Sequence, residues 1–189
     1  FGSKSAALAA IVTMVNRVNQ VYQSDLGITL TLINETQNYI YTDSSTDPYP
    51  DDGYTGDLQA NADTTAGDSS KFDIGHLVTT TNGGVAYAGV CNSTYKAQGL
   101  TGSSTPTGDS FYIDYVAHEI GHQFNALHTF NGTSSSCGGG NRSSTNAYEP
   151  GSGSTIMAYA GICDDEDLQN NSDAYFHAAS IAEITAYVT

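Results

Sequence analysis

Residues 118–128 read HEIGHQFNALH, and this stretch decides how the rest of the chain is interpreted. Histidines four residues apart lie one turn apart on the same face of a helix, so His118 and His122 can reach one metal ion. Zinc binds imidazole nitrogens tetrahedrally, and a catalytic zinc site has three protein ligands and a water. Glu119 directly follows the first histidine, which places its carboxylate beside that water rather than on the metal.

His128 is the third predicted ligand. It follows His122 by six residues, so an uninterrupted helix would rotate it away from the other two. The chain must therefore turn between these two histidines. Asn125 is the expected site of the turn, because asparagine is second to glycine in tolerating positive φ. A lone histidine is usually structural, but three of the five histidines share one register with a glutamate here, and H-E-x-x-H is a zinc motif.

At these residues the chain resembles a known family. H-E-x-x-H-x-x-G-x-x-H followed by a methionine turn marks the metzincin metallopeptidases. This chain has Asn125 in place of the glycine, and STIMAY at residues 154–159 resembles the methionine turn around Met157. The segments VAHEIGHQFNALHTFNG and YEPGSGSTIMAYAGIC resemble the bacterial branch of the reprolysin (adamalysin) group. The resemblance extends from the first predicted helix to the last.

The resemblance implies an α+β, zincin-like metzincin fold in a single catalytic domain, residues 1–189. The upper subdomain, about residues 1–128, would hold a twisted mixed sheet and two helices, the second carrying His118 and His122. The lower subdomain, about residues 129–189, would be mostly irregular and end in a helix. Family members place a strand before the first helix; this chain begins at that helix, so the strand has either been cut away or is absent from the fold.

The implied activity is that of a zinc-dependent endopeptidase. Glu119 would take a proton from the zinc-bound water and hand it to the leaving amine. Met157 would pack beneath the imidazoles as an apolar floor. Tyr159 would bind zinc in the empty enzyme or hydrogen-bond the tetrahedral intermediate, and the alternative is a packed aromatic ring with its hydroxyl in solvent.

Two further segments are candidates for substrate binding. The first resembles an upper-rim edge strand, which pairs with an extended substrate through main-chain hydrogen bonds; the alternative is an ordinary sheet strand. The second would help form the wall of the pocket for the residue after the cleaved bond. The candidate residues are Gly84, Val85, Ala86, Tyr87 and Ala88 in the first segment, and Gly161 and Ile162 in the second.

Hydrophobic spacing predicts the remaining elements. Apolar residues at helical intervals predict helices over residues 5–24, 111–126 and 175–188. Alternation predicts strands over residues 28–32, 72–78 and 84–91, with residues 38–41 extending or pairing with the first strand. Polar and glycine-rich composition predicts loops over residues 43–70, with one short helix, and over residues 99–108 and 131–154.

Composition limits the partners and the location. The 5 Lys and Arg residues against 20 Asp and Glu residues give a net charge of −15, which disfavours nucleic-acid binding. No apolar stretch is long enough to span a bilayer. The acidic, lysine-poor composition and the start at Phe1 favour a processed, secreted bacterial enzyme, although charge alone also serves solubility. We expect a monomer acting on protein or peptide substrates, with an inhibitory propeptide as a candidate partner.

The three cysteines form no C-x-x-C pair, so they do not indicate a metal or redox motif. In an exported protein two of them would form one disulfide. We favour Cys137–Cys163, because these residues flank the expected floor of the site, and Cys91 would then be free or paired elsewhere. His76 and His177 lie outside the motif and are expected to be structural.

Calcium is a second candidate cofactor after zinc. Acidic side chains in two loops could supply oxygen ligands, but no EF-hand spacing is present, so we favour solvated loops. The residues concerned are Asp51, Asp52, Asp57, Asp63, Asp68 and the acidic run 164–167.

Two other functions remain open for the same zinc centre. One is an amidase or peptidase acting on small peptides or cell-wall material. The other is a non-catalytic binding module on the same fold, which is disfavoured because Glu119 and all three histidines are present.

Overall fold

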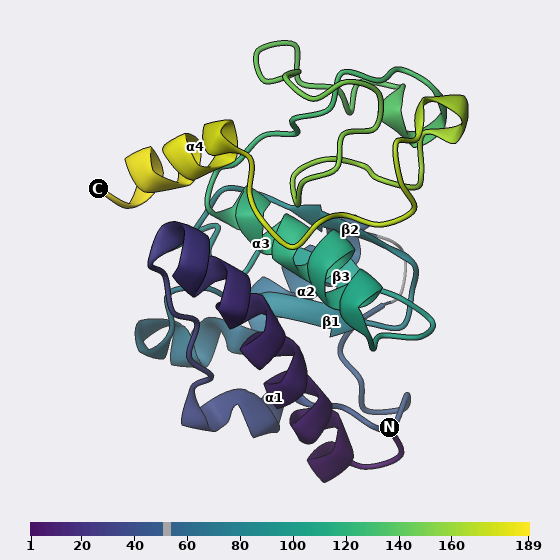
Figure 1. The fold of residues 1–189 in the computed structure, drawn as a ribbon. Helices are drawn as coiled ribbons and strands as arrows, with labels where there is room; N and C mark the ends of the chain where they lie inside the picture. The colour runs from purple at the N-terminus through teal and green to yellow at the C-terminus, as the bar shows by residue number, and fades with distance from the viewer. Residues whose placement is uncertain (51–53) are drawn as a thin grey trace.

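The computed structural model describes residues 1–50 and 54–189, which form a mixed α+β fold around a small sheet (Figure 1). This confirms the predicted fold class. The helices are α1 (Lys4–Val21), α2 (Tyr54–Thr65), α3 (His118–Gln123) and α4 (Ala178–Val188), and the strands are β1 (His76–Thr79), β2 (Gly83–Ala86) and β3 (Gly99–Gly102). Shorter pieces are π-helical at Tyr22–Leu26 and Ser110–Ala117, and 3-10 helical at Asn34–Tyr39, Ala66–Lys71, Ser135–Cys137 and Asp164–Glu166.

The sheet has the order β1-β3-β2, with β1 parallel and β2 antiparallel to the central β3. Successive residues of a strand point to opposite faces. On one face, the paired residues Leu77, Leu100 and Val85 pack against Leu58 of α2. On the other face, Gly99 lies directly against the side chain of Gln123 in α3. The sheet therefore lies between α2 and α3, and α3 crosses in front of it in Figure 1.

Helix α1 forms where the apolar spacing predicts it. The side chain of Ser3 caps its first turn by accepting a hydrogen bond from the Ala6 amide at 3.2 Å. At its other end the chain widens into the π-helical turn Tyr22–Leu26, and the helix ends at Gly27, which has a φ of 67°. A glycine in this left-handed conformation is a frequent helix terminator.

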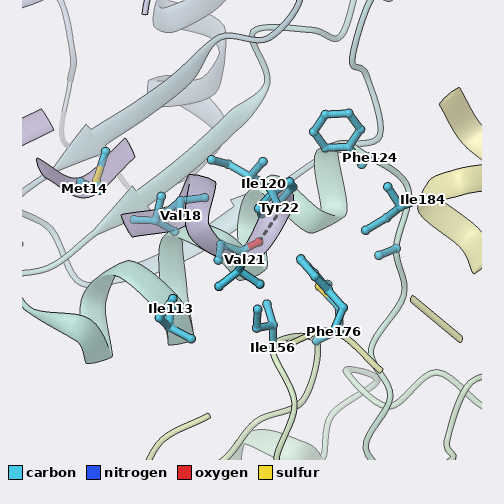
Figure 2. Packing of buried hydrophobic residues seen from close by; sticks show 14 of the residues in the cluster. Met14, Val18, Val21, Tyr22, Ile113, Ile120, Phe124, Ile156, Phe176 and Ile184 are labelled. Atoms are coloured by element: carbon cyan, nitrogen blue, oxygen red, sulfur yellow. Dashed lines mark hydrogen bonds between the residues drawn. The ribbon is translucent and has the colours of Figure 1, made fainter. Parts of the chain in front are cut away.

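The main core joins α1 to segments far away in the sequence. Val18 and Tyr22 are fully buried against the π-helical segment before α3 and against the later residues Phe176 and Ile184 (Figure 2). The hydroxyl of Tyr22 donates to the carbonyl of Ala117 at 2.9 Å. This bond links the end of α1 to the residue immediately before His118, so the position of α1 helps to determine the position of the helix that carries the motif.

The strand predicted over residues 28–32 is absent from the described sheet. Instead, the side-chain amide of Asn19 takes the place of a partner strand: it accepts from the Leu30 amide at 2.7 Å and donates to the Leu30 carbonyl at 2.8 Å. Ile28 and Leu30 still pack against the main core, which explains the alternating pattern. Residues 38–41 do not extend a strand either, because the 3-10 helix Asn34–Tyr39 occupies the first two of them and the other two belong to no described strand.

The prediction of a loop over residues 99–108 is wrong for its first four residues, which form the central strand β3. All four residues of β3 are buried. Glycine content suggested a loop, but here the glycines permit close packing. A Cβ on Gly99 would lie 2.3 Å from the Gln123 side chain, and one on Gly102 would lie 1.8 Å from the Thr81 carbonyl oxygen.

Three other boundaries differ from the prediction. The expected short helix in residues 43–70 is the twelve-residue α2, which buries Leu58 against the sheet. β1 begins only at His76. β2 ends at Ala86, because the chain then bends so that the amides of Gly89 and Val90 donate to the Gln123 carbonyl. The proposed calcium ligands Asp51 and Asp52 lie outside the described residues.

The segment after His128 is largely irregular until α4, as predicted, and surrounds a second buried cluster. Phe130 and Ala158 pack there on the Cys137–Cys163 disulfide, whose Cα atoms are 5.3 Å apart. This confirms the favoured pairing, and Cys91 is a free, exposed thiol. Within the described residues, no helix combines the length and the apolar character required to cross a bilayer.

We expect Tyr22→Phe to lower the free energy of unfolding by about 1–3 kcal/mol, because the fully buried Ala117 region loses a hydrogen-bond donor. Urea denaturation measures the difference. Tyr187→Phe is the matched control, since its hydroxyl donates to Val90 at 3.3 Å on the surface. Equal stability of the two variants would show that the Tyr22 hydroxyl does not anchor α1.

Candidate metal centre

The three histidines of the motif converge on one point. The Nε2 atom of His118 lies 3.1 Å from those of His122 and His128, and the latter two are 2.9 Å apart. Zinc–nitrogen bonds of about 2.0–2.1 Å in tetrahedral geometry separate two ligand nitrogens by about 3.3 Å. The imidazoles therefore have nearly the spacing of a zinc site. Among the described residues, they are the one group of three or more His, Cys, Asp or Glu side chains close enough to hold an ion.

The opposite ring nitrogens fix the orientation of each imidazole. Each Nδ1 atom lies within 2.7 Å of a main-chain carbonyl oxygen, and a carbonyl can only accept, so each Nδ1 carries the hydrogen and donates it. The acceptors are Ile156 at 2.6 Å for His118, Ala126 at 2.7 Å for His122 and Asn141 at 2.6 Å for His128. Such bonds to the outer nitrogen are the usual support of metal-binding histidines.

This arrangement suits a cation and little else. With Nδ1 protonated, a neutral imidazole has only a lone pair at Nε2, so the three converging Nε2 atoms cannot hydrogen-bond one another. Protonation is disfavoured as well: burial, followed by the nearby His128 ring, lowers the pKa of His122 to about 3. Burial also lowers the pKa values of His118 and His128. The donor set is therefore neutral at pH 7 and fits zinc.

The turn that brings His128 back lies where the sequence predicts it. Asn125 has a φ of 71°, in the left-handed region. Around it the amide of Asn125 donates to the His122 carbonyl at 2.8 Å, and the amide of Ala126 donates to the Gly121 carbonyl at 3.0 Å. These bonds end α3 at Gln123, and the chain then turns back toward the metal centre.

Glu119 lies beside the imidazoles and under the edge of the sheet. Its side chain is buried, and its Oε2 atom has no hydrogen-bond partner in the part of the chain that the structure describes. Burial raises its pKa to about 8. A Cβ on Gly84 of β2 would lie 2.5 Å from Oε1, so the missing side chain of Gly84 makes room for the carboxylate. A cation on the imidazoles would favour the ionised form of Glu119.

Met157 lies beneath the same helix. It is fully buried in the main core, and a Cβ on Gly121 would lie 2.5 Å from its sulfur. The glycine within HEIGH thus lets α3 rest directly on the methionine. The role expected for Met157 is packing, and this position agrees with it.

Tyr159 stands next to the imidazoles. Its ring centroid is 4.5 Å from that of His128 and 5.6 Å from that of His118, and it stacks on Phe130 at 4.6 Å. Burial, then the charge of Glu119, raises the pKa of its phenol, which therefore stays protonated at neutral pH. A protonated phenol is a hydrogen-bond donor.

The candidate substrate-binding residues lie on two sides of the centre. β2 pairs with β3 on one side, and no other described strand pairs with its outer side, so the main chain of Gly84, Val85 and Ala86 is an open sheet edge. The next residue, Tyr87, is 55% exposed, and Ala88 follows it outside the strand.

On the other side, a turn after the methionine segment presents Gly161 and Ile162. Gly161 has a φ of 84°, and its amide donates to Asp167 at 3.1 Å. Ile162 is 39% exposed, so its side chain is available to a ligand. The roles of both segments stay predictions.

The remaining histidines have structural contacts. His76 lies between Gln123 at 2.7 Å and Thr101 at 2.8 Å, and so fixes the end of α3 to the sheet. His177 caps α4 through the Ala179 amide at 3.1 Å.

Calcium binding gains no support from the described residues. Asp63 accepts a hydrogen bond from Gln59, and Asp68 binds Tyr39 and Lys71. In the acidic run 164–167, the side chains of Glu166 and Asp167 accept hydrogen bonds from main-chain amides of neighbouring loops. These carboxylates organise the loops rather than lying free in solvent.

Glu149 is a buried residue of the site that sequence reasoning missed. Its carboxylate binds both the residue after His128 and the turn that leads to Met157. A signal was available in the sequence: between Glu119 and Asp164, Glu149 is the only acidic residue.

Comparison with known proteins agrees with this geometry. The model of a family described as metallo-peptidase family M12B, reprolysin-like, matches residues 1–188. A search of curated proteins gives no match.

We expect Gly84→Ala to lower the rate of peptide hydrolysis by about 10²-fold, because the added methyl group must displace the Glu119 carboxylate by an ångström or so. Zinc content should stay at the wild-type level, since no ligand moves. Gly67→Ala is the matched control, because nothing lies within 4 Å of its Cβ position. A fully active Gly84→Ala variant would contradict the close contact.

Proposed function

Because the chain belongs to the reprolysin-like metallopeptidases of family M12B, we propose that it is a zinc-dependent endopeptidase that cleaves internal peptide bonds of proteins. One observation carries the proposal. Three imidazole lone pairs converge within 3.1 Å, and the next residue after His118 is the buried Glu119, whose Oε2 atom has no partner among the described residues and whose carboxylate lies against the open sheet edge.

In this proposal His118, His122 and His128 hold one zinc ion. When bound there, zinc would supply a Lewis acid for the scissile carbonyl and for the attacking water. Glu119 would accept the proton of that water and return it to the leaving amine. Glu119 is buried and its Oε2 atom has no hydrogen-bond partner among the described residues, and a cation on the imidazoles would favour the ionised form that accepts the proton. The close contact between Met157 and Gly121 would hold α3, and with it Glu119, in position during the reaction.

Tyr159 is the proposed electrophilic partner. Its phenol is protonated and packed against His128, so it can donate a hydrogen bond to the oxygen on which negative charge develops. Stacking on Phe130 holds the ring in place and limits the reorganisation needed during the reaction.

The sheet edge favours cleavage of an extended chain over cleavage of a small amide. An extended peptide beside β2 would gain main-chain hydrogen bonds along Gly84–Ala86 and would pass directly over Glu119. Gly161 and Ile162 would contact the residue after the cleaved bond. One alternative is an amidase or peptidase for small peptides or cell-wall material, which does not require an open strand edge. The other is a binding module, which does not require Glu119 beside the three histidines.

The Cys137–Cys163 disulfide supports folding in an oxidising compartment. We therefore propose that the protein is secreted, in agreement with its acidic composition. The same proposal includes a bacterial origin, a monomeric state and control by an inhibitory propeptide. It also includes one catalytic domain divided near His128.

The decisive variant is Glu119→Gln. We expect hydrolysis of casein and of an internally quenched peptide with blocked termini to fall by about 10²- to 10⁴-fold, because the proton acceptor is lost. Zinc content should remain that of the wild type, and a chelator should abolish wild-type activity until zinc is returned. Glu35→Gln, on the surface beside Lys71, is the control.

Two outcomes would overturn the assignment. A zinc-loaded wild type that hydrolyses small amides but neither casein nor the blocked peptide would favour the amidase. Binding of peptides without any hydrolysis would favour the binding module.

Tyr159→Phe tests the second proposed catalytic group. We expect kcat to fall by about 10²- to 10³-fold with little change in KM, because the hydroxyl acts only when charge develops on the carbonyl oxygen. Steady-state kinetics on the blocked peptide separate the two constants. Tyr95→Phe, at an exposed position, serves as the control, and unchanged kinetics for Tyr159→Phe would leave this tyrosine a packing residue only.

A further inference from the structure

Glu149 is a buried acidic residue, only 8% exposed, and no ion pair among the described residues includes its carboxylate. Burying an ionised group is costly unless hydrogen bonds replace its hydration. Although burial alone would raise the pKa of Glu149, hydrogen bonds from hydroxyl and amide groups outweigh it and lower the pKa below its usual value. The carboxylate is therefore ionised and fully engaged.

Its oxygens have four donors on two segments of the chain. Oε1 accepts from the amides of Ser154 at 2.9 Å and Thr155 at 3.1 Å. Oε2 accepts from the hydroxyl of Thr155 at 2.6 Å and also from the hydroxyl of Thr129. With its oxygens occupied in this way, Glu149 is not a metal ligand itself.

The two segments are those that support the candidate ligands. Thr129 directly follows His128, and its amide donates to the Met157 carbonyl at 3.1 Å. Thr155 directly precedes Ile156, whose carbonyl accepts the Nδ1 hydrogen of His118. The main chain of Glu149 reinforces the link, because its amide donates to the Thr129 carbonyl at 2.9 Å.

We propose that Glu149 is a positioning residue of the metal centre: its carboxylate clamps the chain after His128 to the turn before Met157 and so sets the spacing between the imidazoles of His118 and His128. The inference rests on the proposed zinc site, but not on proteolysis. Glu149 touches neither the ion nor the substrate and acts through Thr129 and Thr155. Its sequence context agrees with this role, because Glu149 is the only acidic residue between Glu119 and Asp164 and its carboxylate still accepts four hydrogen bonds.

The test is metal affinity. Zinc dissociation constants come from chelator competition, and the visible absorption of the Co²⁺-substituted protein reports the ligand geometry directly. We expect Glu149→Ala to raise the zinc dissociation constant by about 10- to 100-fold and to alter the cobalt spectrum, as for other groups that orient ligands. Glu149→Gln should restore most of the affinity, because its oxygen can still accept the two amides while its NH2 group donates to the two hydroxyls.

Glu166→Ala is the matched control. Glu166 also accepts two main-chain amides in this half of the molecule, from Thr133 and Ser134, but among the described residues its side chain makes no hydrogen bond to Thr129 or to the turn at Thr155. Its loss should leave the zinc dissociation constant and the cobalt spectrum unchanged. If Glu166→Ala weakens zinc binding as much as Glu149→Ala does, the effect is general loosening of the loops and the proposal is wrong.

Smaller changes keep the proposal testable if Glu149→Ala does not fold. Thr129→Val and Thr155→Val each remove one hydroxyl at nearly constant volume, and each should weaken zinc binding by less than Glu149→Ala. Wild-type zinc affinity in both folded valine variants would overturn the clamp. A wild-type protein that binds zinc but cleaves nothing would overturn the proposed function instead, and the dissociation constants would still decide the role of Glu149.

Discussion

Three Nδ1–H groups, each donating to a main-chain carbonyl, are the constraint around which the rest of the molecule is arranged. They turn the free lone pairs of His118, His122 and His128 toward one point, where the rings cannot hydrogen-bond one another. The carbonyls come from the end of α3, from the loop that carries the disulfide, and from the turn before Met157. The backbone of each segment must therefore keep one conformation. The disulfide stabilises the loop that carries it, and Glu149 stabilises the turn before Met157.

Close approach of backbones is the second theme. Gly84 admits the Glu119 carboxylate, Gly99 admits Gln123, and Gly121 admits the sulfur of Met157. In each case a single methyl group would enter space already filled by a side chain of α3 or of its support. The helix thus lies close to both the sheet and the methionine turn, with a glycine at each of these contacts. Hydrophobic burial by Tyr22 and its neighbours in the main core stabilises the same helix from a third side.

The sequence predicted the metal centre better than the strands of the sheet and the segments around them. Ligand spacing and the turn at Asn125 depend on local geometry, which a residue pattern records directly. The disulfide was favoured for another reason, namely that its cysteines flank the expected floor of the site. The central strand β3 escaped prediction, because Gly-Leu-Thr-Gly resembles a loop until the side chain that needs the space is known. Residues 28–32 show the opposite error: they alternate like a strand but bind the amide of Asn19. Glu149 was missed because its four donors are distant in sequence or belong to the main chain.

Reliance on peptide carbonyls has a consequence for evolutionary drift. A carbonyl oxygen survives every substitution of its own residue, so the identities of Ile156, Ala126 and Asn141 are free to vary as far as these acceptors are concerned. What selection must preserve instead is the route of the chain, which resides in turn-forming and side-chain-free positions such as Asn125, Gly121 and Gly84. In divergent descendants of such a protein, core packing rather than hydrogen bonding would limit the side chains of Ile156 and Ala126, and the small residues that shape the backbone would vary least.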